Sequence, residues 1–195
     1  RKTRYIYKTG YNPDTDAESG DATDYPSYEV IEYTDGGTQR RMLTRYTYGV
    51  TGFPALPLTK VVYKVGDNDD VANGVEGADK FTTDFAYNSD GTLKYQVQPK
   101  VNGLLPGEED AKDYRLGAEY TYNASGQVVY EKQFICDSYT PGNPPTFTSR
   151  VDQTQTKHEY YSTGASNGLL RYVIIDEGEG KLNLKTEYQY DNYRN

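Results

Sequence analysis

Few residues in this chain have the chemistry of a catalytic site. His158 is the only histidine and Cys136 the only cysteine among 195 residues. A nucleophile–base pair would have to use His158, yet the sequence has no Gly-x-Ser-x-Gly turn and no nucleophile signature around Cys136. We therefore predict no catalytic residue and no enzyme, with His158 as a strand residue. We interpret Cys136 as a partly buried or idle thiol, although a bridge to another chain stays open.

Two acidic runs, residues 14–18 and 67–70, could offer oxygen atoms to calcium. Gly20 stands at the wrong distance for an EF-hand loop, and no glutamate occupies the closing position. We interpret both runs as solvated acidic loops, and leave weak calcium binding open. Among the 29 acidic residues nothing singles out a carboxylate pair for glycoside hydrolysis. The sequence predicts no metal site and no cofactor.

The overall charge and hydropathy narrow the possible partners. The formal net charge is −8 and the isoelectric point is near 4.7, which argues against nucleic acid because phosphates need a positive surface. The sequence has no long apolar run, so it predicts neither a transmembrane helix nor a signal peptide. An acidic, polar surface favours a secreted or cell-surface location.

Tyrosine is the residue that carries burial in this chain. The mean hydropathy is −0.90, but the sequence contains 22 tyrosines, and disordered segments are poor in aromatic residues. A tyrosine buries a large ring while its hydroxyl finds a polar partner or water. Leucine, isoleucine and valine are too few for a thick aliphatic core. We expect thin β-sheets with aromatic faces.

One short pattern organises the sequence. Residues 120–130, Tyr-Thr-Tyr-Asn-Ala-Ser-Gly-Gln-Val-Val-Tyr, place two aromatic residues on one face of a strand, then a turn, then a return strand. Gly126 supplies the left-handed backbone position that closes a short hairpin loop. Residues 85–95 repeat the pattern. The sequence therefore predicts β-hairpins as its repeated unit.

Weaker copies extend this pattern over the whole chain. Copies start near residues 5, 46, 85, 120, 158 and 188. Loose spacing of this kind is typical of repeat proteins, in which each unit stacks on its neighbours. We predict one repeat-built all-β module, residues 1–195, with little helix, and we expect it to be an excerpt of a longer protein.

The residues 85–93 and 120–128 resemble the rearrangement-hotspot (RHS) family, also called tyrosine–aspartate (YD) repeat proteins. The family pattern is an aromatic residue, a spacer, Tyr, Asp or Asn, two variable residues, Gly, a spacer and a hydrophobic residue. Tyr188-Gln189-Tyr190-Asp191 matches its first half, whereas the copies at 5, 46 and 158 keep only part of it. The resemblance implies a strip of β-hairpins that, in large members, forms a shell around a toxin or lies on a cell surface.

The segments between copies are predicted to be connections. Residues 10–20 and 66–80 have the composition of polar loops, and residues 136–145 form a proline-rich loop. Pro99 and Pro106 limit any strand within residues 99–116. We expect any function that is particular to this protein to lie in these segments between the copies.

The sequence favours a non-catalytic structural or scaffold module outside the cell. Its predicted partners are flanking repeats or further copies of itself, because open arrays of strands expose edges that could stack into a filament. The alternatives are a module that recognises glycan or protein through exposed tyrosines, and a fragment of a toxin-encapsulating shell.

Overall fold

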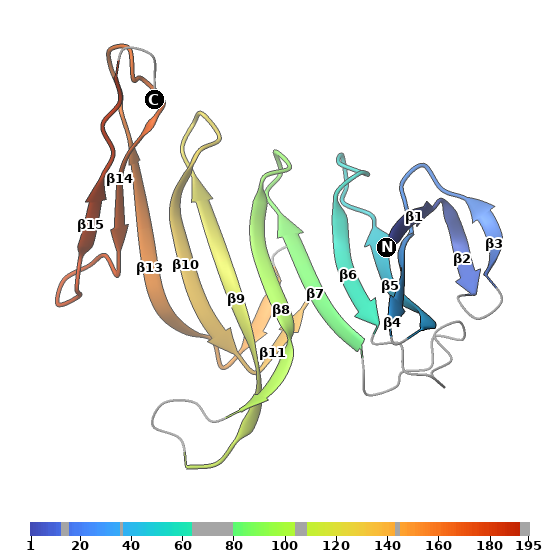
Figure 1. The fold of residues 1–195 in the computed structure, drawn as a ribbon. Coiled ribbons are helices and arrows are strands. Elements are labelled where there is room, and N and C mark those ends of the chain that lie inside the picture. The colour runs from blue at the N-terminus through green and yellow to red at the C-terminus, as the bar shows by residue number, and fades with distance from the viewer. Residues whose placement is uncertain (13–15, 36, 64–79, 104–108, 143–144, 192–195) are drawn as a thin grey trace. The chain divides into compact units, whose positions relative to one another are not determined.

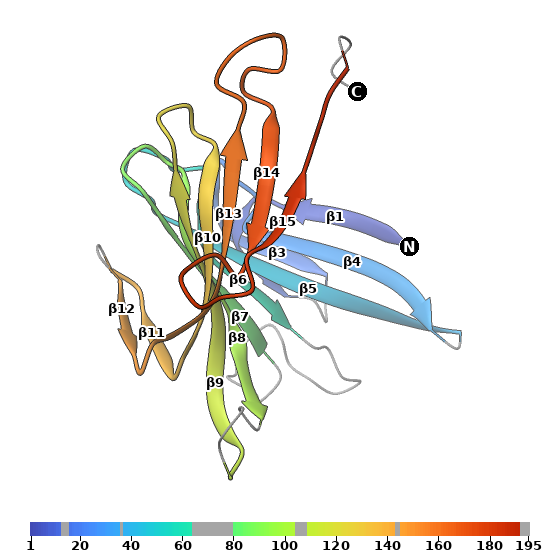
Figure 2. The same cartoon turned by 90° about the vertical axis from the view of Figure 1, so that its left-hand side faces the viewer.

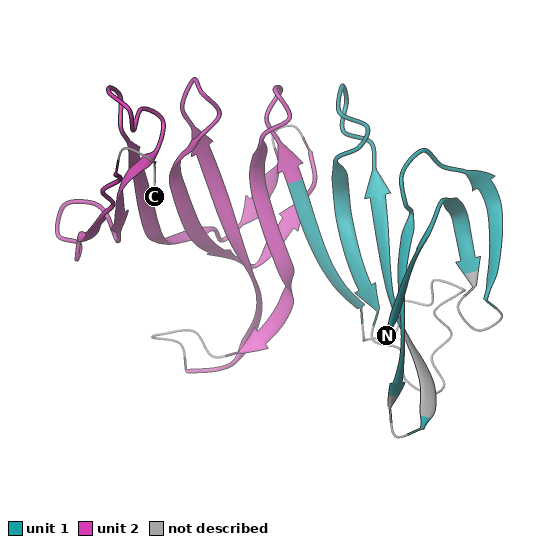
Figure 3. Cartoon of the chain, turned by 45° about the horizontal axis from the view of Figure 1, so that its top comes forward, with its two compact units in different colours: residues 1–85 teal, residues 86–195 magenta. Residues whose placement is uncertain are grey.

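The computed structural model describes residues 1–195 except 13–15, 36, 64–79, 104–108, 143–144 and 192–195. Within that part the chain is all-β and antiparallel, as the sequence predicts, and contains no helix, hence none that could cross a membrane. The chain divides into two compact units, residues 1–85 and 86–195 (Figure 3).

The first unit is a sheet of antiparallel neighbours. Its strand order is β1-β4-β5-β6-β7, and a separate strand pair joins β2 to β3. The bounds are β1 Lys2–Ile6, β2 Lys8–Asn12, β3 Ala17–Ala22, β4 Tyr28–Asp35, β5 Thr38–Tyr48, β6 Pro57–Tyr63 and β7 Lys80–Tyr87, whose last two residues belong to the second unit.

The core of the first unit lies on one face of its sheet. Ile6 of β1 pairs with Tyr28 of β4, and Val30 of β4 pairs with Leu43 of β5. All four are buried, and Tyr11 from β2 completes the cluster. Side chains alternate between the faces of a strand, so these residues share one face. The β2–β3 hairpin therefore supplies part of the core.

The second unit has the strand order β8-β9-β10-β13-β14-β15, with a separate β11–β12 pair. Its strands are β8 Leu93–Gly103, β9 Lys112–Tyr122, β10 Val128–Cys136, β11 Ser138–Thr140, β12 Thr146–Thr148, β13 Val151–Tyr160, β14 Leu170–Ile175 and β15 Leu184–Glu187. The turns before β8, between β9 and β10, and between β13 and β14 lie at one end of this sheet. The connection between β14 and β15 lies at the opposite end (Figure 1).

The second unit builds its core on one face as well. Val97, Phe134 and Cys136 are fully buried there, beside Tyr95. Phe147 of β12 packs against this cluster, with its ring centre 5.0 Å from that of Phe134. Figure 2 shows the β11–β12 hairpin on one side of the β8–β10 strands. Short inserted hairpins thus cover one face in each unit.

Several segments predicted as connections contain strands, with residues 10–12 in β2, 17–20 in β3 and 138–140 in β11. The connection predicted at 66–80 lies, except for Lys80, outside the described residues. Residues 10–20 and 136–145 contribute to the two covering hairpins, because Tyr11 and Tyr139 have aromatic clusters to pack against. The connection predicted at 99–116 is also too long, since β8 reaches Gly103 and β9 begins at Lys112. Pro99 fits within β8 because the β8–β9 register shifts between Val97 and Lys100, and proline is tolerated at such irregularities.

We predict that Gly117→Ala destabilises the protein by about 1–3 kcal/mol, the usual cost of overpacking. A Cβ at Gly117 would overlap the Phe134 ring on the neighbouring strand. Urea unfolding measures the loss.

The same experiment includes Phe134→Leu and the double variant. The leucine relieves the overlap, so the double variant should lose less stability than the sum of the single variants. Strictly additive losses would show that Gly117 and Phe134 do not interact in this way.

Candidate functional site

The two strong copies of the repeat form the same turn. In each, a main-chain bond joins the Asn N–H to the carbonyl four residues later, Asn88 to Thr92 and Asn123 to Gln127, both at 2.9 Å. The glycines of these turns, Gly91 and Gly126, have positive φ angles of 84° and 74°. This is a three-residue loop ending in a left-handed glycine. The Asn and Gly of the pattern are therefore explained by turn geometry.

The asparagine side chain stabilises this turn from within. Asn123 Oδ1 accepts the N–H groups of Ser125 and Gln127 at 2.9 and 3.0 Å, while its Nδ2 donates to Gln127 Oε1 at 2.9 Å. Asn88 Nδ2 donates to Thr92 Oγ1 at the same distance. An asparagine here satisfies loop groups that would otherwise depend on water.

A β-bulge follows the hairpin turn in three copies. Tyr48 pairs with Pro57, Tyr122 with Val128 and Tyr160 with Leu170, and in each case the register shifts at the next pair. One extra residue in the return strand accounts for each shift. The copy at 158, whose sequence departs most from the pattern, therefore has the same bulge as the copy at 120 beside a longer loop.

The tyrosine beside each bulge joins its hairpin to the preceding one. Tyr122 donates its hydroxyl to the Leu93 carbonyl at 2.7 Å, and Tyr160 donates to the Val128 carbonyl at 2.7 Å. In the first unit Tyr48 donates to the Pro26 carbonyl at 2.8 Å. We call this contact the tyrosine clasp. Tyr122 and Tyr160 reach the first residue of a return strand, and Tyr48 reaches Pro26, two residues before β4. The second tyrosine of the pattern therefore has a structural role.

The sequence candidates for chemistry lie apart from one another. His158 in β13 lies two residues before the clasp tyrosine Tyr160, as Tyr120 lies two before Tyr122, and it pairs with Val173. It therefore takes the place of a motif aromatic residue. Cys136 is fully buried at the end of β10, where burial raises the pKa of its thiol.

The acidic loops give no metal cage in the described part of the chain. Residues 14, 15 and 67–70 lie outside it, so calcium binding there stays an open question. Asp16 is described, and its carboxylate accepts hydrogen bonds from Arg4 and Tyr11. Among the described residues no three His, Cys, Asp or Glu side chains converge.

The face of the second unit that the β11–β12 hairpin leaves open contains a shallow groove of about 680 Å³. Ala118 forms the middle of its floor, and its cross-strand partners are Gln96 on β8 and Gln133 on β10. A small residue between two longer ones produces the hollow. Leu116 and Ile135, which also pair across β9 and β10, extend the floor toward one end.

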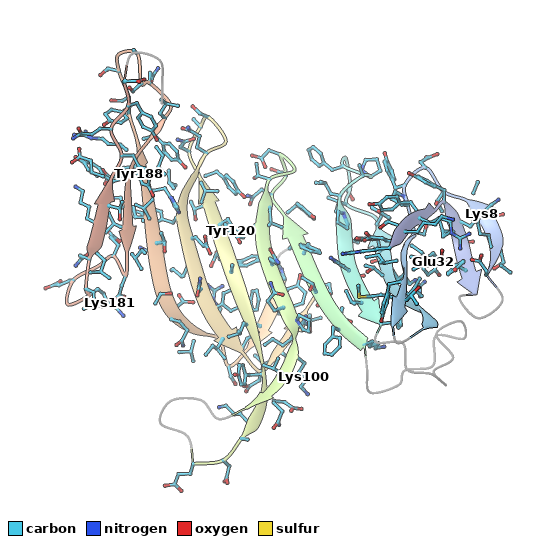
Figure 4. All side chains as sticks on the ribbon, in the orientation of Figure 1. Lys8, Glu32, Lys100, Tyr120, Lys181 and Tyr188 are labelled. Atoms are coloured by element: carbon cyan, nitrogen blue, oxygen red, sulfur yellow. The ribbon has the colours of Figure 1, made fainter. Side chains whose placement is uncertain are left out.

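The walls of the groove are polar and aromatic. The polar lining residues are Gln96, Gln98, Gln133, Gln153, Tyr114, Tyr120 and Glu131. Tyr120 pairs with Glu131, and burial together with that carboxylate raises the pKa of the Tyr120 hydroxyl. Figure 4 shows Tyr120 on β9. The phenol therefore stays protonated at neutral pH and can donate a hydrogen bond.

No pattern in the sequence marks these four glutamines as a group. The four glutamines come from three strands, β8, β10 and β13, and stand between residues of the covered face, such as Gln96 between Tyr95 and Val97. Period-two alternation identifies an outward face on each strand, but only the register shows that these residues converge.

The covered face is held by a charged and aromatic cluster. Arg150 donates to Glu119 at 2.5 Å and to Asp152 at 2.9 Å, and its guanidinium lies 4.3 Å from the ring centre of Phe134. Burial by itself would lower the pKa of Arg150, but the bonds to Glu119 and Asp152 outweigh it, and the pKa is raised above its usual value. Glu119 also accepts the Tyr95 hydroxyl. Arg150 comes two residues after β12, so its bonds to Glu119 and Asp152 attach the covering hairpin to the sheet. This structural role explains the cluster.

No family model matches this chain, and no curated protein matches it. The resemblance of residues 85–93 and 120–128 to the RHS/YD repeat family therefore stays a prediction.

We predict a loss of stability as the pH rises above about 10. Burial and a 3.0 Å hydrogen bond to Glu29 raise the pKa of Tyr46 to about 12, whereas an ordinary tyrosine ionises near pH 10. The folded state thus keeps a proton that the unfolded chain loses, and this contribution is complete below pH 10 and lost between about pH 10 and 12.

Urea unfolding at intervals from pH 8 to 11.5 tests this. Tyr46→Phe has no hydroxyl to ionise and should show a shallower alkaline decline than the unaltered protein. Identical declines for the two proteins would contradict the assignment to Tyr46.

Proposed function

We propose that this chain is a non-catalytic structural β-repeat module. The observation that carries the proposal is the tyrosine clasp, found with the same bulge at Tyr48, Tyr122 and Tyr160. The same contact recurs in copies whose sequences differ, which supports a role in joining neighbouring hairpins. A catalytic residue would instead stand out in one copy.

The energetics favour the same role. An isolated hairpin is marginal in water, so each copy depends on its neighbours for stability. The clasp satisfies a carbonyl at the strand end, where the ladder stops, and a bond of this kind contributes roughly 1 kcal/mol net. The repeated tyrosines thus supply cohesion between neighbouring hairpins of a unit.

The proposed setting is a longer extracellular or cell-surface protein with further repeats. The pattern at residues 85–93 and 120–128, which resembles RHS/YD repeats, supports this, as does the net charge of −8. Part of a toxin-enclosing shell is an alternative setting for the same structural role.

The proposed partners are flanking repeats or further copies of the chain. β1 is the outermost strand in the order of the first unit, and β15 is outermost in the second. All four residues of β15 are exposed. Outermost strands offer main-chain groups to another strand, which is the physical basis for end-to-end assembly.

The clasp is tested by Tyr122→Phe, which removes the hydroxyl and keeps the ring. We expect a loss of about 1 kcal/mol in the free energy of unfolding, and a larger loss for Tyr122→Ala. Urea unfolding gives the values.

Tyr130→Phe is the matched control, since no hydrogen bond from the Tyr130 hydroxyl is seen within the described residues. The clasp has no structural role if Tyr122→Phe and Tyr130→Phe lose the same stability. Tyr160→Phe should repeat the result of Tyr122→Phe.

Assembly is tested separately, by sedimentation velocity at increasing protein concentration and by electron microscopy. We expect association that grows with concentration. Leu184→Lys, at an exposed position of β15, should weaken it, because an inserted charge at a strand edge opposes pairing. A monomer at all concentrations would exclude self-assembly of this chain and leave flanking repeats as the partners.

A further inference from the structure

The groove on the open face of the second unit has a lining that the structural role leaves unexplained. The clasps, bulges and turns account for the second tyrosine, the asparagine and the glycine of the pattern, and the covering hairpin accounts for the buried aromatic residues. None of these contacts requires Gln96, Gln98, Gln133 and Gln153 to gather around one hollow.

We propose that this groove binds a neutral saccharide chain. Primary amides donate and accept hydrogen bonds at once, which matches sugar hydroxyl groups that do the same. The aromatic residues Tyr114 and Tyr120 offer apolar ring surface to the C–H groups of sugar rings. The floor of Leu116, Ala118 and Ile135 gives a further apolar surface.

The charge of the groove selects against other ligands. Among the described residues that line it, Glu131 is the one charged side chain, and none is a lysine or arginine. A sulfated, phosphorylated or carboxylated ligand would find no cation there and would meet Glu131. An apolar peptide would bury amide groups without partners, which is costly. A neutral polyhydroxyl ligand satisfies the amides and the carboxylate together.

The dimensions of the groove suit several sugar rings in line. Tyr114 and Tyr120 stand six residues apart on β9, which is about 20 Å along an extended strand. The volume of about 680 Å³ lies in the range of roughly 300–1,000 Å³ that is usual for ligand sites. The shallow, open form of the hollow permits a chain to enter from its side.

The glutamines of the groove take no part in the tyrosine clasp. The hydroxyl of Tyr122 reaches the Leu93 carbonyl near the hairpin turns, whereas the floor residue Ala118 lies further along β9. Gln96 and Gln133 are exposed or half-buried on the open face, opposite the buried Val97 and Phe134. Substitutions of these glutamines should therefore leave folding intact.

The test screens the full chain against immobilised neutral glycans, covering glucans, mannans, galactans and N-acetylated polymers, with sulfated and sialylated glycans as the charged set. We expect saturable binding to at least one neutral polymer and none to the charged set. Isothermal titration with the corresponding oligosaccharide then gives the affinity.

Three variants locate the site: Gln96→Ala, Gln133→Ala and Tyr120→Ala. Each should weaken binding about tenfold, the effect of losing one good polar or stacking contact. Gln189→Ala, an exposed glutamine outside the groove, is the control and should bind as the unaltered protein does. Urea unfolding of each variant confirms that the fold is kept.

The proposal is overturned if no neutral glycan is retained, if only the charged set binds, or if all three variants bind as tightly as the control. Binding of a peptide library in place of glycans would also overturn it. Tyr122→Phe separates the two proposals, because it should lower stability and leave glycan affinity unchanged at temperatures where the variant is folded.

Discussion

The structure depends on hydrogen bonds from tyrosine hydroxyls to main-chain carbonyls, which join neighbouring hairpins where their strand pairing ends. Neighbouring hairpins pair along their strands, but this pairing ends at Tyr95–Glu119 between β8 and β9 and at Tyr130–Lys157 between β10 and β13, short of the turns. The hydroxyls of Tyr122 and Tyr160 reach carbonyls beyond those ends, at Leu93 and Val128. A hydroxyl on a rigid ring is well suited to this, because few rotatable bonds are fixed when the contact forms.

A thin sheet also needs cover on one face, and both units obtain it from short inserted hairpins. Tyr11 arrives from β2 in the first unit, and Phe147 arrives from β12 in the second. The chain is poor in aliphatic residues, so these aromatic side chains provide much of the burial that stabilises each unit. The β2–β3 and β11–β12 hairpins therefore contribute to the cores of their units, although the polar and proline-rich composition of these segments predicts loops.

Because the β11–β12 hairpin covers one face of the second unit, the opposite face is available for the proposed saccharide binding. In the second unit, neighbours on one strand have opposite roles, since Phe134 packs in the core and Gln133 lines the groove. The division follows from the alternation of side chains along a strand. Stability and the proposed saccharide binding are thus assigned to different faces, and the groove can vary in sequence without weakening the core.

The sequence by itself determined the all-β class, the hairpin turns at Gly91 and Gly126 and the scarcity of helix, because these depend on local backbone preference and period-two alternation. It also placed His158 at a motif position. The tertiary structure alone decided that β2, β3, β11 and β12 cover the sheets, that Arg150 joins Glu119 and Asp152, and that four distant glutamines meet. These depend on strand order and register, which bring residues together from far apart in the chain and leave no periodic trace in the sequence.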